Sequence, residues 1–455
     1  MIKYTSIRVG QLGKIVTGKT PKTSIPENYG GDYMFIGPID LHKHFIISES
    51  EKMISEKGFN SIKTNTLNGL SILVGCIGWD MGNVALVEKK CATNQQINSI
   101  TNIKDDYNPF YIYYWFKGKK AFLFKISNVT RTPLLNKTDF SNIIINLPNI
   151  STQKQIAKVL SDLDTKIEVN NKINQELEAM AKLVYDYWFV QFDFPMPKDY
   201  AASIGKPELA GRPYKTSGGK MVYNAELKRE IPEGWEVKYI KEIEPNVITG
   251  KTPSTKKEEN FGGDIPFITI DDIRQSRFIY HTERTLTKVG ADTQSTKYLE
   301  EYDICVSCIG TVGVIGFVGK KAQTNQQINT ISKPKEYNRY YLFQYLQDYF
   351  DFNVAAKKGA VLSNMNKGEF ELIPVIESNL KLRQLYYNKV DSNFKIIANN
   401  IRQNQKLAEL RDWLLPMLMN GQVRVEKGYE EVEDVVSGPD SYREAAEDGV
   451  KYGEG

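Results

Sequence analysis

At 455 residues the chain is too long for one ordinary domain, and its 41% hydrophobic and 25% charged residues are typical of a soluble globular protein. Nothing near its start resembles a signal peptide and no apolar run approaches the length of a membrane span, so we expect a cytoplasmic protein with no membrane partner. The formal net charge is +4, but residues 426–455 contain ten acidic and three basic residues, which leaves a basic body that permits a polyanionic partner.

The chain carries the same sequence pattern twice. Residues 17–21, Thr-Gly-Lys-Thr-Pro, recur at 249–253, which is 232 positions later. The other matches, in the same order, pair 28–32 with 260–264, 76–78 with 308–310, 93–98 with 324–329, and 136–137 with 366–367. Because the offset drifts only from 232 to 230, each half is interpreted as one copy of the same domain.

Within each copy the pattern indicates short strands followed by a helix. Apolar, β-prone runs broken by glycine and turn residues occupy 33–39, 70–77 and 84–87 in the first copy, and 265–270 and 304–309 in the second. Helical stretches follow at 109–124 and 339–352. The sequence therefore predicts two compact α+β domains, at 1–150 and 235–378.

A heptad pattern follows each domain. Its first seam consists of Ile156, Leu160, Leu163, Ile167, Asn170, Asn174, Leu177, Ala181, Val184 and Trp188. The spacing predicts a long coiled-coil helix at 151–191, with Thr152 and Gln155 as a capping box at its start. A second helix is expected at 379–421, where Val390, Ile397, Asn400, Asn404, Leu407 and Leu414 match the first seam 230 positions on.

The matched asparagines favour packing of the two helices on each other over burial of each helix on its own domain, because a seam asparagine fixes register. An antiparallel coiled coil gives the molecule a pseudo-twofold axis, with two α+β domains joined by two long helices. The residues expected to pair are Leu160, Ile167, Asn170, Asn174, Leu177, Val390, Ile397, Asn400, Asn404 and Leu407. Proline, glycine and lysine between the halves predict an extended linker at 192–234, and the acidic end, 422–455, is expected to be flexible.

Motifs for chemistry on a substrate are missing from the sequence. No glycine-rich nucleotide-binding loop occurs, and residues 108–110, Asn-Pro-Phe, lack the second proline of an adenine methyltransferase motif. Three histidines without acidic or cysteine partners favour surface positions over a metal site. Cys305 and Cys308 form a CxxC, but Cys305 matches Leu73, which favours a core position. We therefore expect no catalytic residue, metal or cofactor in this chain.

The duplicated motifs resemble those of the specificity subunits of type I restriction–modification systems. The resemblance rests on Thr-Gly-Lys-Thr-Pro at 17–21 and 249–253, aromatic-Gly-Gly-Asp at 29–32 and 261–264, Asn-Gln-Gln at 94–96 and 325–327, Phe-Asp-Phe-Pro at 192–195, and Ile-Pro-Glu-Gly-Trp-Glu at 231–236. It covers residues 1 to about 425 and does not include the acidic end.

This resemblance implies two target-recognition domains that each read half of a split site in double-stranded DNA. It implies helices that fix the gap between the half-sites and bind two methyltransferase subunits, with restriction and translocase subunits completing the complex. Methylation and cleavage, and with them S-adenosylmethionine, ATP and magnesium, would belong to those partner subunits.

Three stretches in each copy supply donors and acceptors for bases and phosphates. The candidate DNA-binding residues are Lys19, Thr20, Lys22, Thr130, Arg131, Thr132 and Lys137 in the first copy, and Lys251, Thr252, Lys256, Lys257, Lys357, Lys358 and Lys367 in the second. The first stretch fits a structural turn equally well. Asn-Gln-Gln is identical in both copies, which favours structural hydrogen bonding. Arg131, Lys357 and Lys358 are the best candidates because their stretch differs between copies, and a solvated loop is the alternative.

Two other functions compete with DNA recognition. A single-chain methyltransferase or nuclease needs the catalytic motifs that the sequence lacks. A coiled-coil scaffold that bridges proteins needs no polyanion, and its binding would not weaken steeply with salt as DNA binding does.

Overall fold

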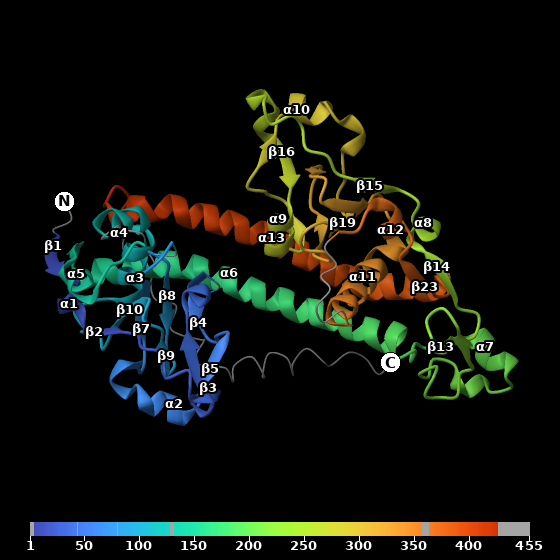
Figure 1. Cartoon of the computed structure of the whole chain (residues 1–455), viewed down its shortest axis with the longest axis horizontal. Helices are drawn as coiled ribbons and strands as arrows, with labels where there is room; N and C mark the ends of the chain where they lie inside the picture. Colours follow the sequence, from blue (N-terminus) through green and yellow to red (C-terminus); the bar gives the residue numbers. More distant parts are fainter. Residues whose placement is uncertain (1–3, 43, 80, 128–131, 357–363, 426–455) are drawn as a thin grey trace, which may run out of the picture. The chain divides into compact units, whose positions relative to one another are not determined.

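The structure is a computed structural model that describes residues 4–42, 44–79, 81–127, 132–356 and 364–425 (Figure 1). It divides into unit 1, Met1–Thr165 with Glu409–Gly455, and unit 2, Lys166–Ala408. Each of the two long helices, α6 (Ile150–Tyr185) and α13 (Leu380–Met419), contributes one segment to each unit. In the described part of the chain, no helix is both long enough and apolar enough to cross a membrane.

Unit 1 is built on a five-stranded sheet. Its strands, in spatial order, are β2 (Lys14–Thr17), β10 (Ile97–Thr101), β7 (Ser71–Gly75), β8 (Val84–Val87) and β4 (Ile46–Ile47). The central strand β7 is buried on both faces, because Ile72 and Val74 pack toward the helices while Leu73 joins a second cluster on the other side. Helix α3 (Pro109–Lys117) covers the first face at β7 and β8 (Figure 1).

The remaining strands of unit 1 form two smaller sheets. One contains β5 (Lys52–Ile54), β3 (Tyr29–Ile36), β9 (Cys91–Thr93) and β6 (Thr66–Leu67); the other pairs β1 (Thr5–Arg8) with β11 (Ile144–Leu147). The other short helices are α1 (Val9–Leu12), α2 (Glu56–Ser61), α4 (Lys120–Ile126) and α5 (Lys137–Asn142). The helix expected at 109–124 is thus interrupted between α3 and α4, at Gly118 and Lys119, where glycine's low helix propensity favours a break.

Unit 2 repeats this strand order. Its five-stranded sheet contains β15 (Val247–Thr249), β22 (Ile328–Ile331), β19 (Ile304–Ser307), β20 (Ile315–Val318) and β17 (Phe278–Ile279). Beside it lie β18 (Thr285–Leu286), β16 (Phe261–Ile268) and β21 (Gln323–Thr324), and the pair β14 (Glu236–Tyr239) and β23 (Pro374–Glu377). The helices are α8 (Ile240–Ile243), α9 (Ile270–Gln275), α10 (Lys288–Asp292), α11 (Glu336–Ala356) and α12 (Lys367–Glu371). The two copies predicted from the sequence therefore share one α+β fold.

The first long helix, α6, begins one turn earlier than the predicted capping box places it, whereas α13 begins at Leu380, within one residue of its expected start at 379. Helix α6 starts at Ile150, and the Oδ1 of Asn149 accepts a hydrogen bond from the backbone nitrogen of Thr152 over 2.9 Å. Asn379 has the corresponding place before α13 and accepts from the nitrogen of Lys381 over 2.8 Å. Thr152 and Gln155 are thus helical residues, and an asparagine caps each helix because its short side chain reaches the free N–H groups of the first turn.

The seam asparagines join α6 and α13 within unit 2. Asn170 donates to the Oδ1 of Asn404 over 2.8 Å, and Asn400 donates to the Oδ1 of Asn174 over 2.9 Å. Residue numbers rise along one helix as they fall along the other, so the helices run antiparallel over this stretch. Of the ten predicted pairing residues, Leu160, Asn170, Asn174, Val390, Ile397 and Asn400 are buried, and Ile167, Leu177, Asn404 and Leu407 are half-buried.

The segment expected to be an extended linker is folded. It contains helix α7 (Lys198–Ser203) and the hairpin of β12 (Met221–Asn224) and β13 (Arg229–Pro232) (Figure 1). Phe194 stacks between Tyr214, at 4.6 Å, and Trp235, at 5.2 Å. These aromatic side chains belong to the core of unit 2, so burial of apolar surface holds a segment whose proline and glycine content alone suggests extension.

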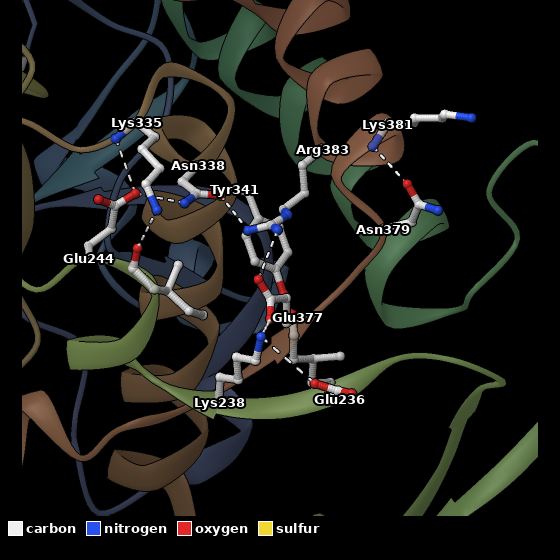
Figure 2. Close-up of polar contacts among 12 residues, drawn as sticks. Glu236, Lys238, Glu244, Lys335, Asn338, Tyr341, Glu377, Asn379, Lys381 and Arg383 are labelled. Carbon is white, nitrogen blue, oxygen red and sulfur yellow. Dashed lines mark hydrogen bonds and ion pairs between the residues drawn. The ribbon is translucent and has the colours of Figure 1, made fainter.

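A polar network fixes the start of α13 against unit 2 (Figure 2). The buried guanidinium of Arg383 donates to the Oδ1 of Asn338 over 2.5 Å and to the Oε1 of Glu377 over 3.1 Å. Asn338 in turn donates to the Oε1 of Glu244 over 2.6 Å, and Lys238 forms an ion pair with Glu377. In unit 1 the residue that matches Arg383 is the neutral Gln153, which accepts from the nitrogen of Asn108 over 2.9 Å.

Candidate nucleic-acid interface

The Thr-Gly-Lys-Thr-Pro loop and the Asn-Gln-Gln turn meet in unit 1. Thr20 donates from its hydroxyl to the Oε1 of Gln95 over 2.7 Å, and the nitrogen of Lys19 donates to the carbonyl of Thr93 over 2.9 Å. A Cβ on Gly18 would lie 2.0 Å from the carbonyl oxygen of Asn94, so the loop can approach the turn only with glycine at this position.

The same junction recurs in unit 2 with the same atoms. Thr252 donates to the Oε1 of Gln326 over 2.7 Å, and the nitrogen of Lys251 donates to the carbonyl of Thr324 over 2.9 Å. A Cβ on Gly250 would lie 2.1 Å from the carbonyl oxygen of Asn325. We call this junction the frame; it consists of residues 18–20 with 93–96 in unit 1 and 250–252 with 324–327 in unit 2.

Hydrogen bonds inside the Asn-Gln-Gln turn support its structural interpretation. Asn94 donates from its side chain to the Oε1 of Gln96 over 2.9 Å, and the pair of Asn325 and Gln327 has the same distance. The middle glutamines, Gln95 and Gln326, are exposed beside the threonines that they pair with.

In each unit, backbone hydrogen bonds connect the third predicted stretch to the frame by way of the turn that follows β7 in unit 1 and β19 in unit 2. In unit 1 the nitrogen of Leu135 donates to the carbonyl of Cys76 over 2.9 Å, and the nitrogen of Cys76 donates to the carbonyl of Gln96 over 2.8 Å. In unit 2 the nitrogen of Met365 donates to the carbonyl of Cys308 over 2.7 Å. In each unit, the described parts of three stretches that are far apart in sequence are thus connected through backbone hydrogen bonds.

The candidate residues fall into three groups. Lys19, Lys22, Thr132, Lys137, Lys251, Lys256, Lys257 and Lys367 are exposed, and Thr20 and Thr252 are half-buried. Lys137 and Lys367 begin α5 and α12, and Lys367 also pairs with Glu371 over 3.4 Å. Thr130, Arg131, Lys357 and Lys358 lie outside the described residues.

A turn that the sequence reasoning missed lies beside the frame in each unit. In unit 1 it carries Trp79, which is 78% exposed, and in unit 2 the exposed Thr311. Near it, the Nδ2 of Asn83 lies 2.9 Å from the Nε2 of His42, and the Nη2 of Arg274 donates to the Oγ1 of Thr311 over 2.6 Å. We call this turn and its contact partner the tip. The signal in the sequence was the repeat offset, which falls from 232 to 231 between the Cys-Ile-Gly and Asn-Gln-Gln motifs because the turn in unit 2 is one residue shorter.

The cysteine pair occupies the core of unit 2, as its match with leucine predicts. Cys305 and Cys308 are buried at the end of β19, and burial raises the pKa of Cys305 to about 12 and that of Cys308 to about 11. High pKa values keep these thiols protonated, and the nucleophilic or metal-binding form of cysteine is the thiolate. Over the described residues, no cluster of three or more His, Cys, Asp or Glu could hold a metal ion.

Comparison with known proteins identifies the family. The family model for the type I restriction modification DNA specificity domain matches residues 1–179 and 232–405. The chain is 33% identical over 334 residues, 64% of its length and 71% of the relative, to the type I restriction enzyme HindI specificity subunit of Haemophilus influenzae. It is 27% identical over 437 residues, 92% of its length and 93% of the relative, to the MjaIX specificity subunit of Methanocaldococcus jannaschii.

A solved structure supports the fold independently. The S subunit of a type I restriction–modification system from M. genitalium superimposes with a TM-score of 0.54 at 16% identity, covering 92% of this chain and 96% of that one. Since the two stretches matched by the family model cover most of the sequence and coincide with the two copies, the chain belongs to the family of type I restriction–modification DNA specificity proteins.

Proposed function

We propose that this chain is the DNA-recognition subunit of a type I restriction–modification complex, in which each unit binds one half of a bipartite site. The observation that carries the proposal is the repeated frame with different tips. The frame contains the same hydrogen bond in both units, from Thr20 to Gln95 and from Thr252 to Gln326. The side chains of the neighbouring tips differ between the units. Two readers of different half-sites need a common scaffold with different side chains at the groove.

The side chains of these stretches suit binding and not bond breaking. Lysines at 19, 22, 251, 256 and 257 are exposed and supply charge for phosphates. Threonine hydroxyls and glutamine amides supply neutral donors and acceptors for bases. In this proposal the chain is non-catalytic, and methylation and cleavage belong to partner subunits together with S-adenosylmethionine, ATP and Mg²⁺.

The helices are proposed to form an antiparallel coiled coil around a pseudo-twofold axis. Support comes from the asparagine hydrogen bonds: at the repeat offset of 230, Asn170 corresponds to Asn400 and Asn404 to Asn174. The bond from Asn170 to Asn404 therefore corresponds to the bond from Asn400 to Asn174 with the helices exchanged. A paired rod of this kind would set the gap between half-sites and offer equivalent docking surfaces to two methyltransferase subunits.

The test is co-expression of the chain with the methyltransferase encoded beside its gene, followed by sequencing of host DNA for methylated adenine. The expected result is one split motif, methylated on opposite strands in its two halves. The methyltransferase expressed alone is the control and should leave that motif unmodified. An assembled complex that methylates no such motif would contradict the proposal and favour a protein-bridging scaffold.

A further inference from the structure

The tip of unit 2 contains an arginine held in place at the edge of the frame. Arg274 in α9 forms an ion pair between Nη1 and the Oδ1 of Asp271 at 3.0 Å, and its Nη2 donates to Thr311 over 2.6 Å. Its side chain is nevertheless 47% exposed. The two contacts use part of the donor set of the guanidinium, so further N–H groups are available to a ligand.

The position of Arg274 relative to the frame follows from the turn that it contacts. Thr311 follows Gly310, and a Cβ on Gly310 would meet only the Nε2 of Gln327, at 3.8 Å, with no other atom within 4 Å. The side of the turn at Gly310 therefore faces Gln327, which belongs to the Asn-Gln-Gln part of the frame. The candidate phosphate-binding lysine, Lys251, belongs to the same frame.

The first copy has a different residue at this position. Arg274 matches His42 at the offset of 232, and the side chain of each contacts a residue of the segment that follows the Cys-Ile-Gly motif. His42 pairs there with Asn83, whose Oδ1 also accepts from Lys120 over 3.0 Å. Position 42/274 thus has the same place in the fold of each unit, although it ends a 3-10 helix (Pro38–His42) in unit 1 and lies in α9 in unit 2. Its side chain differs between the units, as expected for a residue that distinguishes one half-site from the other.

A purely structural role explains these contacts less well. Asp271 is 75% exposed, and exposed ion pairs contribute little to stability. Two hydrogen-bond partners fix the orientation of the half-exposed guanidinium of Arg274. Less conformational entropy is then lost when this planar group binds two acceptor atoms that lie in one plane. The planar acceptor pair that arginine binds most often in the major groove of DNA is O6 and N7 of guanine.

We propose that Arg274 is a specificity-determining residue that recognises a guanine in the half-site bound by unit 2, and that His42 has the equivalent position for the half-site bound by unit 1. This inference rests on the proposed function and adds to it the residue and the base.

The test is selection from a library with both half-sites randomised, using the complex of the full chain with its methyltransferase. The wild-type complex should select guanine at one position of one half-site. Arg274→Ala should reduce the preference for guanine there by roughly 5- to 150-fold while leaving the other half-site unchanged. Arg274→Gln should move the preference toward adenine, because a glutamine amide matches N6 and N7 of adenine.

His42→Ala is the matched control and should alter only the half-site that Arg274→Ala leaves unchanged. Unaltered guanine preference in Arg274→Ala overturns the inference, and so does an equal loss of affinity for all sequences, which indicates a phosphate contact. Either result leaves the bipartite motif in place and so leaves the proposed function intact. A wild-type complex that selects no bipartite motif instead contradicts the proposed function itself.

Discussion

Asn170 in α6 donates a hydrogen bond of 2.8 Å to the Oδ1 of Asn404 in α13, and both belong to unit 2. Asn170 is almost fully buried, and it also donates to the Oε1 of Gln403 over 2.8 Å. A buried amide without a partner costs more than the hydrogen bond contributes, so helix pairings that separate the asparagines are disfavoured. The pair therefore specifies the register of the two helices.

Replacing one member of this pair should destabilise unit 2. Asn170→Ala leaves the Oδ1 of Asn404 without its donor, and we expect the free energy of unfolding to fall by about 1–3 kcal/mol. Urea denaturation followed by circular dichroism measures the change. The double variant Asn170→Leu with Asn404→Leu removes both polar groups and should be close to neutral. A double variant whose loss in free energy of unfolding equals the summed losses of the two single variants would contradict this account.

A buried carboxylate in unit 1 provides a second test. Asp164, with a side chain only 4% exposed, accepts from the hydroxyl of Tyr114 over 2.7 Å and forms ion pairs with Arg411 and Lys117. Arg411→Met removes one of the two cations and should cost about 1.5–3 kcal/mol, because Asp164 stays buried with Lys117 as its remaining ion-pair partner. Lys158→Met is the matched control, since its pair with Asp162 is 72% and 61% exposed; its cost should stay below about 1 kcal/mol. Equal effects of the two substitutions would show that the Asp164 cluster is not a buried ion pair.

The regular elements of the fold were predictable from local pattern. The repeat locates both copies of the α+β fold, the run at 84–87 coincides with β8, and the heptad spacing locates α6 and α13. Locally determined signals, such as apolar periodicity and turn residues, were sufficient for these elements. The fold of 192–234 was missed because the stacking of Phe194 on Tyr214 and Trp235 is a tertiary interaction that composition does not reveal.

The candidate site was predictable only in part. The motifs located the frame, but the contact of Arg274 with Thr311 joins residues 37 positions apart and depends on how α9 packs beside the β19 turn. Comparison of the two repeats could have indicated this position, because residue 42 is histidine and the matching residue 274 is arginine within a matched region. Arg131, Lys357 and Lys358, the preferred sequence candidates, lie outside the described residues and remain predictions.

The network around Glu377 predicts a pH dependence of stability (Figure 2). Burial alone would raise the pKa of Glu377, but Lys238 and Arg383 lower it below its ordinary value. A carboxylate with a depressed pKa stabilises the folded state above its unfolded pKa, which is about 4.3 for glutamate, and this stabilisation is lost as the pH falls through the folded pKa. Lys238→Met should therefore lower the melting temperature at pH 7 and have progressively less effect toward pH 3.

Thermal melts of wild type and Lys238→Met between pH 7 and pH 3 measure this convergence. Glu377→Gln removes the titrating group, so Lys238→Met added to it should show little pH dependence over the same range. A difference between wild type and Lys238→Met that stays constant down to pH 3 would mean that Glu377 is not the titrating partner.

Salt dependence separates phosphate contacts from base contacts. Lys19 and Lys251 occupy the same exposed place on the two frames. Each should neutralise one phosphate, so Lys19→Ala or Lys251→Ala should reduce the slope of log affinity against log salt by about 1 without changing the recognised motif. Titrations of the assembled complex at several salt concentrations measure the slope. Lys57→Ala, which alters an exposed pair with Glu27 and lies outside the residues of the frame, should leave it unchanged.

The proposed role of the helices in spacing the half-sites is tested by changing their length. Seven residues inserted after Asn174 in α6 and before Asn400 in α13, which face each other, keep the heptad phase and lengthen the pair by about 10 Å. Since B-DNA rises about 3.4 Å per base pair, the gap in the methylated motif should grow by about 3 base pairs while both half-sites stay the same.

Insertion in α6 alone is the control. It shifts Asn170 and Asn174 by a full heptad relative to the part of α6 that follows them. The asparagine pairs and the later contacts of α6 with α13 then cannot both form, so the complex should lose its fixed gap or fail to methylate. Sequencing of methylated adenines in host DNA gives both results directly. A paired insertion that leaves the gap unchanged means that the helices do not set the spacing, and the gap must then be determined by the partner methyltransferases.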